Sequence, residues 1–128
     1  MKAQVSTEFI LYAAILVFIL AFAAYFAVVT AGDIRTEGVN TDAKRVAAII
    51  ATEINTAVEV GDGYSRRFFL PQTLYSDTNY TVSIDAQRVY VLWNSRSYSL
   101  PVLAGNTTGV PAKGYNTLKN VNGVIIFV

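Results

Sequence analysis

The sequence predicts an α+β protein in which one long N-terminal helix precedes a small antiparallel β-sheet domain. Three observations lead to this prediction. Residues 9–31 form a run of 23 residues without a charged side chain, and residues 41–58 repeat apolar side chains at the spacing of one helical face. Residues 64–128 contain short segments rich in β-branched and aromatic residues, with turn residues between them. A chain of 128 residues has room for one such helix and one small domain.

Residues 4–31 are predicted to form a hydrophobic helix that spans a membrane or fills the core of a filament. Thirteen of the 23 residues in the uncharged run are Ile, Leu, Val or Phe, and each favours insertion by about 0.3–0.6 kcal/mol. A helix needs about 20 apolar residues to cross the hydrocarbon core, whereas a secretory signal peptide has an apolar run of only about 7–15. We therefore expect a retained span. Lys2 is the only basic residue before the run, so the positive-inside rule places the N-terminus in the cytoplasm and the rest outside the cell.

Residues 32–62 are predicted to continue this helix in amphipathic form. Gly32 and Gly38 weaken a helix by up to about 1 kcal/mol each relative to Ala, which predicts a weak point between the two halves. From Thr41 the apolar residues return with a period of 3.6 and form one face, which we expect to pack on the β-domain. That face consists of Ala43, Val46, Ala47, Ile50, Ile54, Ala57 and Val58. The residues expected largely off it are Asp42, Lys44, Arg45, Glu53 and Asn55, and Gly61-Asp62-Gly63 is expected to end the helix.

Residues 63–128 are predicted to form the C-terminal antiparallel β-domain. The clearest strand segments are 67–70, 80–84, 88–93, 97–100, 115–120 and 124–128. Turns are expected at 85–87, 94–96 and Asn122-Gly123, the last being a strong hairpin signal. We expect one sheet of four to six strands with one face on the amphipathic half of the helix. Tyr90 and Trp93 are expected to be packed strand residues, whereas any exposed cluster of the other aromatic residues would suit subunit contacts or adhesion.

The composition argues against catalysis. The chain has no cysteine and no histidine, which removes disulfides, thiolate nucleophiles, zinc-type sites and the commonest general base. After Gly32 there are nine basic and eight acidic residues, so there is no basic field for nucleic acid. We therefore expect neither an enzyme nor a cofactor or metal site. The pair Arg66-Arg67 is expected to be a solvated strand start rather than a ligand site.

Two triplets match the acceptor sequence for N-glycosylation. They are Asn79-Tyr80-Thr81 and Asn106-Thr107-Thr108. If the β-domain lies outside the cell, both asparagines are candidate glycosylation sites. Asn106 is the better candidate because it lies in a loop rich in Gly, Thr and Pro, whereas Asn79 directly precedes a predicted strand.

A short polar motif precedes the apolar run. The sequence QVSTE at residues 4–8, followed directly by an apolar helix, resembles the class III signal peptide of archaeal type IV pilin-like proteins, Q-x-S-x-E-x-x-x-L. The motif covers about the first dozen residues, and it departs from the family pattern at Ala3, where Gly is frequent, and at Tyr12, where Leu is expected. The resemblance implies a type IV pilin-like fold. It also implies that prepilin peptidase cuts between Ala3 and Gln4 and removes the leader peptide, residues 1–3.

The resemblance implies a structural function. Before assembly the chain would span the cell membrane once, and afterwards it would be a subunit of a type IV-like pilus, a homo-oligomeric helical filament outside the cell that serves adhesion to an unknown target. Glu8 matches the family's acidic docking residue. From the chemistry alone, a carboxylate beside an apolar run is costly to bury unpaired, and the α-amino group that cleavage would release on a neighbouring subunit is a suitable partner. The alternative is a membrane-anchored cell-surface or minor pilin-like protein that does not polymerise in bulk. A third reading, an enzyme on a membrane anchor, lacks reactive side chains.

Overall fold

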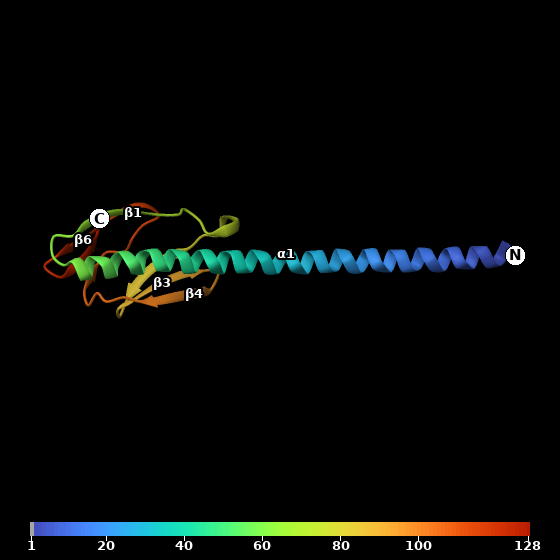
Figure 1. Ribbon diagram of the computed structural model, residues 1–128, viewed down its shortest axis with the longest axis horizontal. Coiled ribbons are helices and arrows are strands. Elements are labelled where there is room, and N and C mark those ends of the chain that lie inside the picture. Colours follow the sequence, from blue (N-terminus) through green and yellow to red (C-terminus); the bar gives the residue numbers. More distant parts are fainter. Residues whose placement is uncertain (1) are drawn as a thin grey trace. The chain divides into compact units, whose positions relative to one another are not determined.

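The computed structural model of the protein describes the backbone of residues 2–128 and the side chains of residues 4–128 (Figure 1). It has the predicted α+β layout, with a long N-terminal helix followed by a small, mostly antiparallel β-domain. In these residues the elements are α1 (Lys2–Val60), β1 (Ser65–Leu70), the 3₁₀ helix η1 (Tyr75–Asp77), β2 (Thr81–Asp85), β3 (Arg88–Trp93), β4 (Arg96–Pro101), β5 (Thr107–Thr108), β6 (Gly114–Val121) and β7 (Val124–Phe127). The chain divides into two compact units, of which the first ends at Thr36 and the second is Glu37–Val128.

The first unit is helical and contains the uncharged run. All its side chains from Gln4 to Thr36 are exposed, so none of the described residues covers them. Gly32 lies in the helix of this unit, and Gly38 lies in the helical part of the second, so α1 is assigned through both glycines. The boundary between the two units falls between these two residues, where the sequence predicts a weak point.

The second unit has its own hydrophobic core, which is built on the helical residues 37–60. The predicted apolar face is confirmed, because six of its members are buried and Val58 packs against them partly buried. Val39 and Ala51 widen this face, and both are buried. The strands contribute large buried side chains to the same core, namely Phe68, Leu70, Val89, Val91, Trp93, Leu118 and Ile125. As expected, Trp93 is packed in the core, and Tyr90 is half-buried.

The strands form two sheets, whereas one sheet of four to six strands was expected. The first has the order β1-β6-β7-β5, and the second has the order β2-β3-β4. Pairing is antiparallel except between β5 and β7, which are parallel. Figure 1 shows β1 and β6 on one side of the helical part of this unit and β3 and β4 on the other. A helix whose buried face extends round to Ala51 and Glu53 is too broad for one sheet to cover, and this explains the second sheet.

The three tight turns are confirmed at the predicted places. Ala86-Gln87 joins β2 to β3, Asn94-Ser95 joins β3 to β4, and Asn122-Gly123 joins β6 to β7. All six residues have positive φ, between 42° and 81°. Two-residue hairpin turns of this kind match the twist of the paired strands, and Asn and Gly adopt them at little cost. The end of α1 is also as predicted, because the helix stops at Val60 and Gly61 follows with φ 92°.

One buried asparagine ties the helix end to the sheet. Asn120 on β6 donates from Nδ2 to the carbonyl oxygen of Ala57 at 2.8 Å, and its Oδ1 accepts from the Gly123 backbone N–H at 3.0 Å. The same carbonyl also accepts from the Gly61 backbone N–H at 3.1 Å. A buried polar group without a hydrogen bond is costly, and these bonds satisfy the Asn120 amide while they join the last turn of α1 to the β6–β7 turn.

Glu53 corrects an expectation about the charged side of the helix. The period placed it off the apolar face, but it is buried and its Oε1 lies 3.5 Å from Nη1 of Arg66 on β1. The ion pair makes burial of the carboxylate tolerable, because a buried charge without a partner is costly. The Tyr64 hydroxyl and the Glu53 carboxylate raise the pKa of the Arg66 guanidinium. Arg66 itself is exposed, in agreement with a solvated strand start.

Candidate functional site: the exposed apolar segment of α1

The candidate site is a surface rather than a pocket, and it consists of the apolar side chains of residues 9–31. Large side chains around the whole helix are exposed, for example Phe9 at 73%, Phe18 at 72% and Val28 at 73% of their surface. Side chains about 100° apart along a helix cannot all face one core. A helix that is apolar all round is stable when lipid or other protein covers it. The surface therefore requires a covering that the described residues do not supply.

The length of the segment fits a membrane. At about 1.5 Å per residue, the 23 uncharged residues span about 35 Å, and the hydrocarbon core of a bilayer is about 30 Å thick. By length and composition α1 is the one helix of the described chain that is able to cross a membrane. It is thus a candidate membrane span near the N-terminus, and the predicted span at residues 4–31 lies within it.

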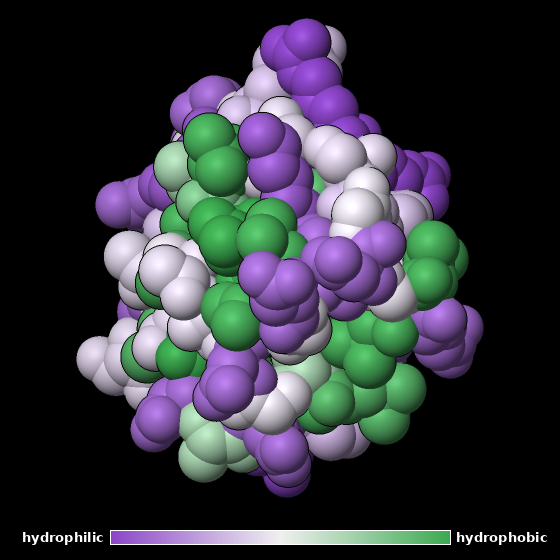
Figure 2. Space-filling view, turned by 90° about the vertical axis from the view of Figure 1, so that its left-hand side faces the viewer, coloured by the Kyte–Doolittle hydropathy of each residue, from purple (hydrophilic) through white to green (hydrophobic). Residues whose placement is uncertain are grey.

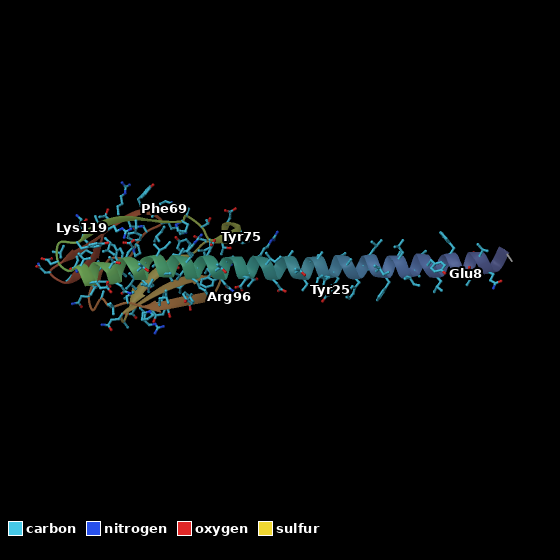
Figure 3. The ribbon with its side chains drawn as sticks, in the orientation of Figure 1. Glu8, Tyr25, Phe69, Tyr75, Arg96 and Lys119 are labelled. Atoms are coloured by element: carbon cyan, nitrogen blue, oxygen red, sulfur yellow. The ribbon has the colours of Figure 1, made fainter. Side chains whose placement is uncertain are left out.

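Glu8 lies at the N-terminal edge of this surface. Its side chain is exposed and points away from the helix axis (Figure 3). The described residues form two ion pairs, Arg45 with Asp42 at 2.9 Å and Arg66 with Glu53 at 3.5 Å, and neither involves Glu8. If the surrounding surface is covered by an apolar phase, this carboxylate needs a partner from outside the described chain.

The predicted cleavage site lies at the start of α1. The Ala3 side chain is outside the described residues, whereas Gln4 is exposed. Because α1 begins at Lys2, the Ala3–Gln4 peptide bond is in the first helical turn. The first N–H groups of a helix have no partner within it, so this turn opens more easily than the turns inside the helix. A peptidase that takes extended substrate would need only this local opening.

Small residues lie at regular places within the surface. Ala23, Ala27 and Ala31 follow one another every four residues, and each is exposed. Residues at this spacing share one helical face. Small side chains at such positions let two helix backbones approach closely in an apolar phase.

The second unit has a hollow beside Tyr80. This hollow of about 230 Å³ is lined by Leu70, Tyr80, Val82, Pro111 and Lys113 among others. The Tyr80 hydroxyl donates to the carbonyl oxygen of Pro71 at 2.5 Å, and burial raises the pKa of Tyr80 to about 12. The phenol therefore stays protonated at neutral pH and does not act as a base there. The described residues also bring together no group of three or more metal-ligating side chains.

The two candidate glycosylation sites differ in their surroundings. Both asparagines are exposed. The Asn79 side-chain oxygen accepts hydrogen bonds from Nζ of Lys113 and from the Tyr80 backbone N–H. The Asn106 backbone carbonyl accepts from Ile125 N–H at 3.1 Å, which anchors its loop beside β7. The side chain of Asn79 is thus held by its neighbours, whereas Asn106 presents its side chain on an anchored loop.

The structure also shows a surface cluster that the sequence did not reveal. Phe69 on β1 stands opposite Tyr115 on β6, with ring centroids 5.1 Å apart in edge-to-face geometry. The guanidinium of Arg67 lies 4.3 Å from the centre of the Tyr115 ring. The two aromatic rings remain 50% and 68% exposed. Residues 67 and 115 lie far apart in the sequence, so only the strand register brings them together.

Comparisons with known proteins leave these observations to stand by themselves: no family model, no curated protein and no solved structure matches the chain.

Proposed function

We propose that this chain is a structural subunit of an extracellular filament of the archaeal type IV pilus kind, with no catalytic role. One observation carries the proposal: an apolar helical surface with no covering in the described chain begins directly after the QVSTE motif at residues 4–8. Before assembly, lipid covers this surface. After assembly, the same segments of other copies cover it, and the β-domains form the outside of the filament.

The two environments are chemically alike for the helix. Apolar side chains leave lipid and enter a bundle of like helices with little change in hydration, so packing and polar contacts decide the balance. The face with Ala23, Ala27 and Ala31 permits close approach in such a bundle. The chain has no cysteine, so no disulfide joins the subunits. The packed helices supply the contacts that hold the filament together.

Glu8 supplies a registration device in this proposal. Prepilin peptidase would release the α-amino group of Gln4, which is positively charged below its ordinary pKa of about 7.7–8.0. In one chain Gln4 and Glu8 share a helical face because they are four residues apart. In the bundle, the amine of one subunit would neutralise Glu8 of its neighbour. A subunit at the wrong height would leave Glu8 buried and unpaired, which is strongly unfavourable.

A second candidate is a membrane-anchored surface or minor pilin-like protein that does not polymerise in bulk. The observation that favours it is the complete core of the second unit, because a domain that buries its own apolar residues needs only one lipid-covered anchor. The two candidates share the membrane span and the N-terminus in the cytoplasm. They differ in whether identical chains cover the apolar helix.

The test of the filament begins with the native N-terminus and with sheared cells. We expect intact-mass analysis to give Gln4, or its cyclised pyroglutamate form, as the first residue, and sheared filaments to contain the chain. Cyclisation would remove the amine and exclude it as the partner of Glu8. A protein that keeps Met1 and extracts from membranes only as a monomer would contradict the filament.

Glu8→Ala tests the registration device. We expect this variant to insert in the membrane but to lower filament yield by about a hundredfold or more, since removing one member of a buried charge pair costs about 3–5 kcal/mol. Glu37→Gln is the matched control, because it neutralises an exposed acid of α1 outside the apolar run. Normal filament yield from Glu8→Ala would remove Glu8 from the mechanism.

A further inference from the structure

The outer face of the four-stranded sheet carries positive charge and exposed aromatic rings. In the strand register Phe69 is opposite Tyr115, Arg67 is opposite Thr117, and Ser65 is opposite Lys119. Phe69, which Figure 3 labels, lies on the outer side of this sheet. We call the group Arg67, Phe69, Tyr115 and Lys119 the platform. All four side chains are exposed.

The platform has no acidic partner on its own face. Alternation along the strands places Ser65, Thr117, Val121, Val124 and Ile126 beside it, and none of the described residues of this face is acidic. Neither Arg67 nor Lys119 takes part in an ion pair of the described chain. Arg67 and Lys119 are diagonal neighbours, about 7–8 Å apart at their backbones, so two positive charges stand together. A face of this kind favours an anionic partner that also carries an apolar group.

The opposite chemistry stands at the end of α1. Glu59 and Val60 are in its last turn, Asp62 follows, and all three are exposed, with Val60 at 64%. The last turn contains no basic residue. An acid at this position is unfavourable, because the helix dipole is negative at its C-terminal end. We call Glu59, Val60 and Asp62 the acidic tip. The end of the second unit seen in Figure 2 has apolar patches set between hydrophilic residues.

We propose that the platform of one copy binds the acidic tip of a second copy. Arg67 and Lys119 would neutralise Glu59 and Asp62, and Val60 would cover the rings of Phe69 and Tyr115. Two cations meet two acids, and an exposed apolar side chain meets two exposed rings. This interaction rests on the proposed function, because the filament is what brings many identical chains together.

The two surfaces are different, so the contact is of the head-to-tail kind. Such contacts continue from copy to copy and give open helical assemblies unless the rotation closes a ring. The charges also exclude two wrong pairings, since platform against platform and tip against tip both bring like charges together. The contact would thereby fix direction along the filament at the β-domains, in addition to the registration that Glu8 supplies between the helices.

The first test reverses the charges in the full-length chain. We expect Arg67→Glu with Lys119→Glu to lower the yield of sheared filaments by about tenfold, which corresponds to about 1.4 kcal/mol. Glu59→Lys alone should also lower it, and the triple variant should recover part of the yield over the double variant, because the lysine introduced at position 59 faces the two glutamates while Asp62 keeps its negative charge. Arg96→Glu is the control, because Arg96 is an exposed cation on β4, in the other sheet. Wild-type yield from Arg67→Glu with Lys119→Glu would overturn the proposal.

The second test separates this docking from filament formation itself. Because the chain has no cysteine, Glu59→Cys and Lys119→Cys chains are co-expressed with different tags and treated with a short bis-maleimide. We expect the yield of mixed dimer from Glu59→Cys with Lys119→Cys to exceed the yield from Glu59→Cys with Arg96→Cys about fivefold or more. Only residues 59 and 119 lie at the proposed contact. No excess in cells that make filaments overturns the docking and leaves the filament. An excess in membranes without filaments supports the docking and contradicts the filament. If there is no excess and no filament forms, both proposals are contradicted.

Discussion

The two units of this chain differ in whether their apolar helical side chains are exposed or buried. In residues 9–31, Ile, Leu, Val and Phe are exposed around the whole helix. In residues 37–60 of the same assigned helix, the apolar residues are fewer, keep to one face and are buried under two sheets. The difference shows that the hydrophobicity of a helix does not by itself predict what covers it. The distribution of apolar residues around the helix does: an apolar stripe on one face predicts a partner within the chain, whereas apolar residues around the whole circumference predict a partner outside it.

The largest expected effect contrasts buried and exposed apolar residues. Ile54 is fully buried, so Ile54→Ala should lower the free energy of unfolding of the second unit by about 2–5 kcal/mol. Leu20 is 60% exposed, and Leu20→Ala should leave that unit unchanged. Denaturant unfolding followed by the fluorescence of Trp93, the single tryptophan, measures both. An equal loss from the two variants would show that the two regions are not independent.

The sequence was sufficient for the parts of the fold that depend on local pattern. The helix end at Val60 follows from Gly61, and the turn at Asn122-Gly123 follows from residues that adopt positive φ. The division into two sheets and the parallel pairing of β5 with β7 were not predicted. Strand order depends on contacts between distant segments, and a two-residue strand such as Thr107–Thr108 has no periodicity to detect.

Only those parts of the candidate surfaces that are contiguous in sequence were predictable. The apolar run and Glu8 are contiguous in sequence, so they are visible without a structure. The platform is not, because Arg67 and Tyr115 meet only through the register of β1 with β6. The burial of Glu53 also escaped prediction, since its position on the helix is polar by sequence, and only the presence of Arg66 on β1 makes burial acceptable.

A smaller effect is expected on the free energy of unfolding of the second unit at alkaline pH. Burial raises the pKa of Tyr80 to about 12, above its unfolded value of about 10. The folded state therefore holds the proton more tightly, and this contribution is complete below pH 10 and is lost as the pH rises from 10 to 12. By pH 12 the loss should be roughly 2 kcal/mol.

Tyr80→Phe is the comparison for this titration. It removes the ionisable hydroxyl and the hydrogen bond to Pro71, so it should be less stable than wild type at pH 7. The gap between the two proteins should narrow as the pH rises from 10 to 12. Parallel stability curves over that range would show that Tyr80 does not carry the alkaline sensitivity.

The smallest effect distinguishes the two glycines of α1. A Cβ on Gly38 would lie 2.7 Å from Cδ1 and 2.9 Å from Cγ of Tyr75, whereas a Cβ on Gly32 would meet nothing within 4 Å. Alanine favours a helix over glycine by about 1 kcal/mol at either place. At Gly38 the Tyr75 ring must move, and overpacking of this kind costs about 1–3 kcal/mol, so Gly38→Ala should be less stable by about 1 kcal/mol.

Tyr75 decides whether this reading of Gly38 is correct. The ring is 47% exposed, so Tyr75→Ala should cost little elsewhere, and Gly38→Ala made in that background should become stabilising. The same substitution at Gly32 should stabilise its helix with or without Tyr75, as measured by helical content in detergent. If Gly38→Ala stabilised the wild-type second unit, the absence of a side chain at residue 38 would have to be explained by something other than packing. Gly38 is glycine because an aromatic ring covers it, whereas no contact among the described residues explains glycine at Gly32.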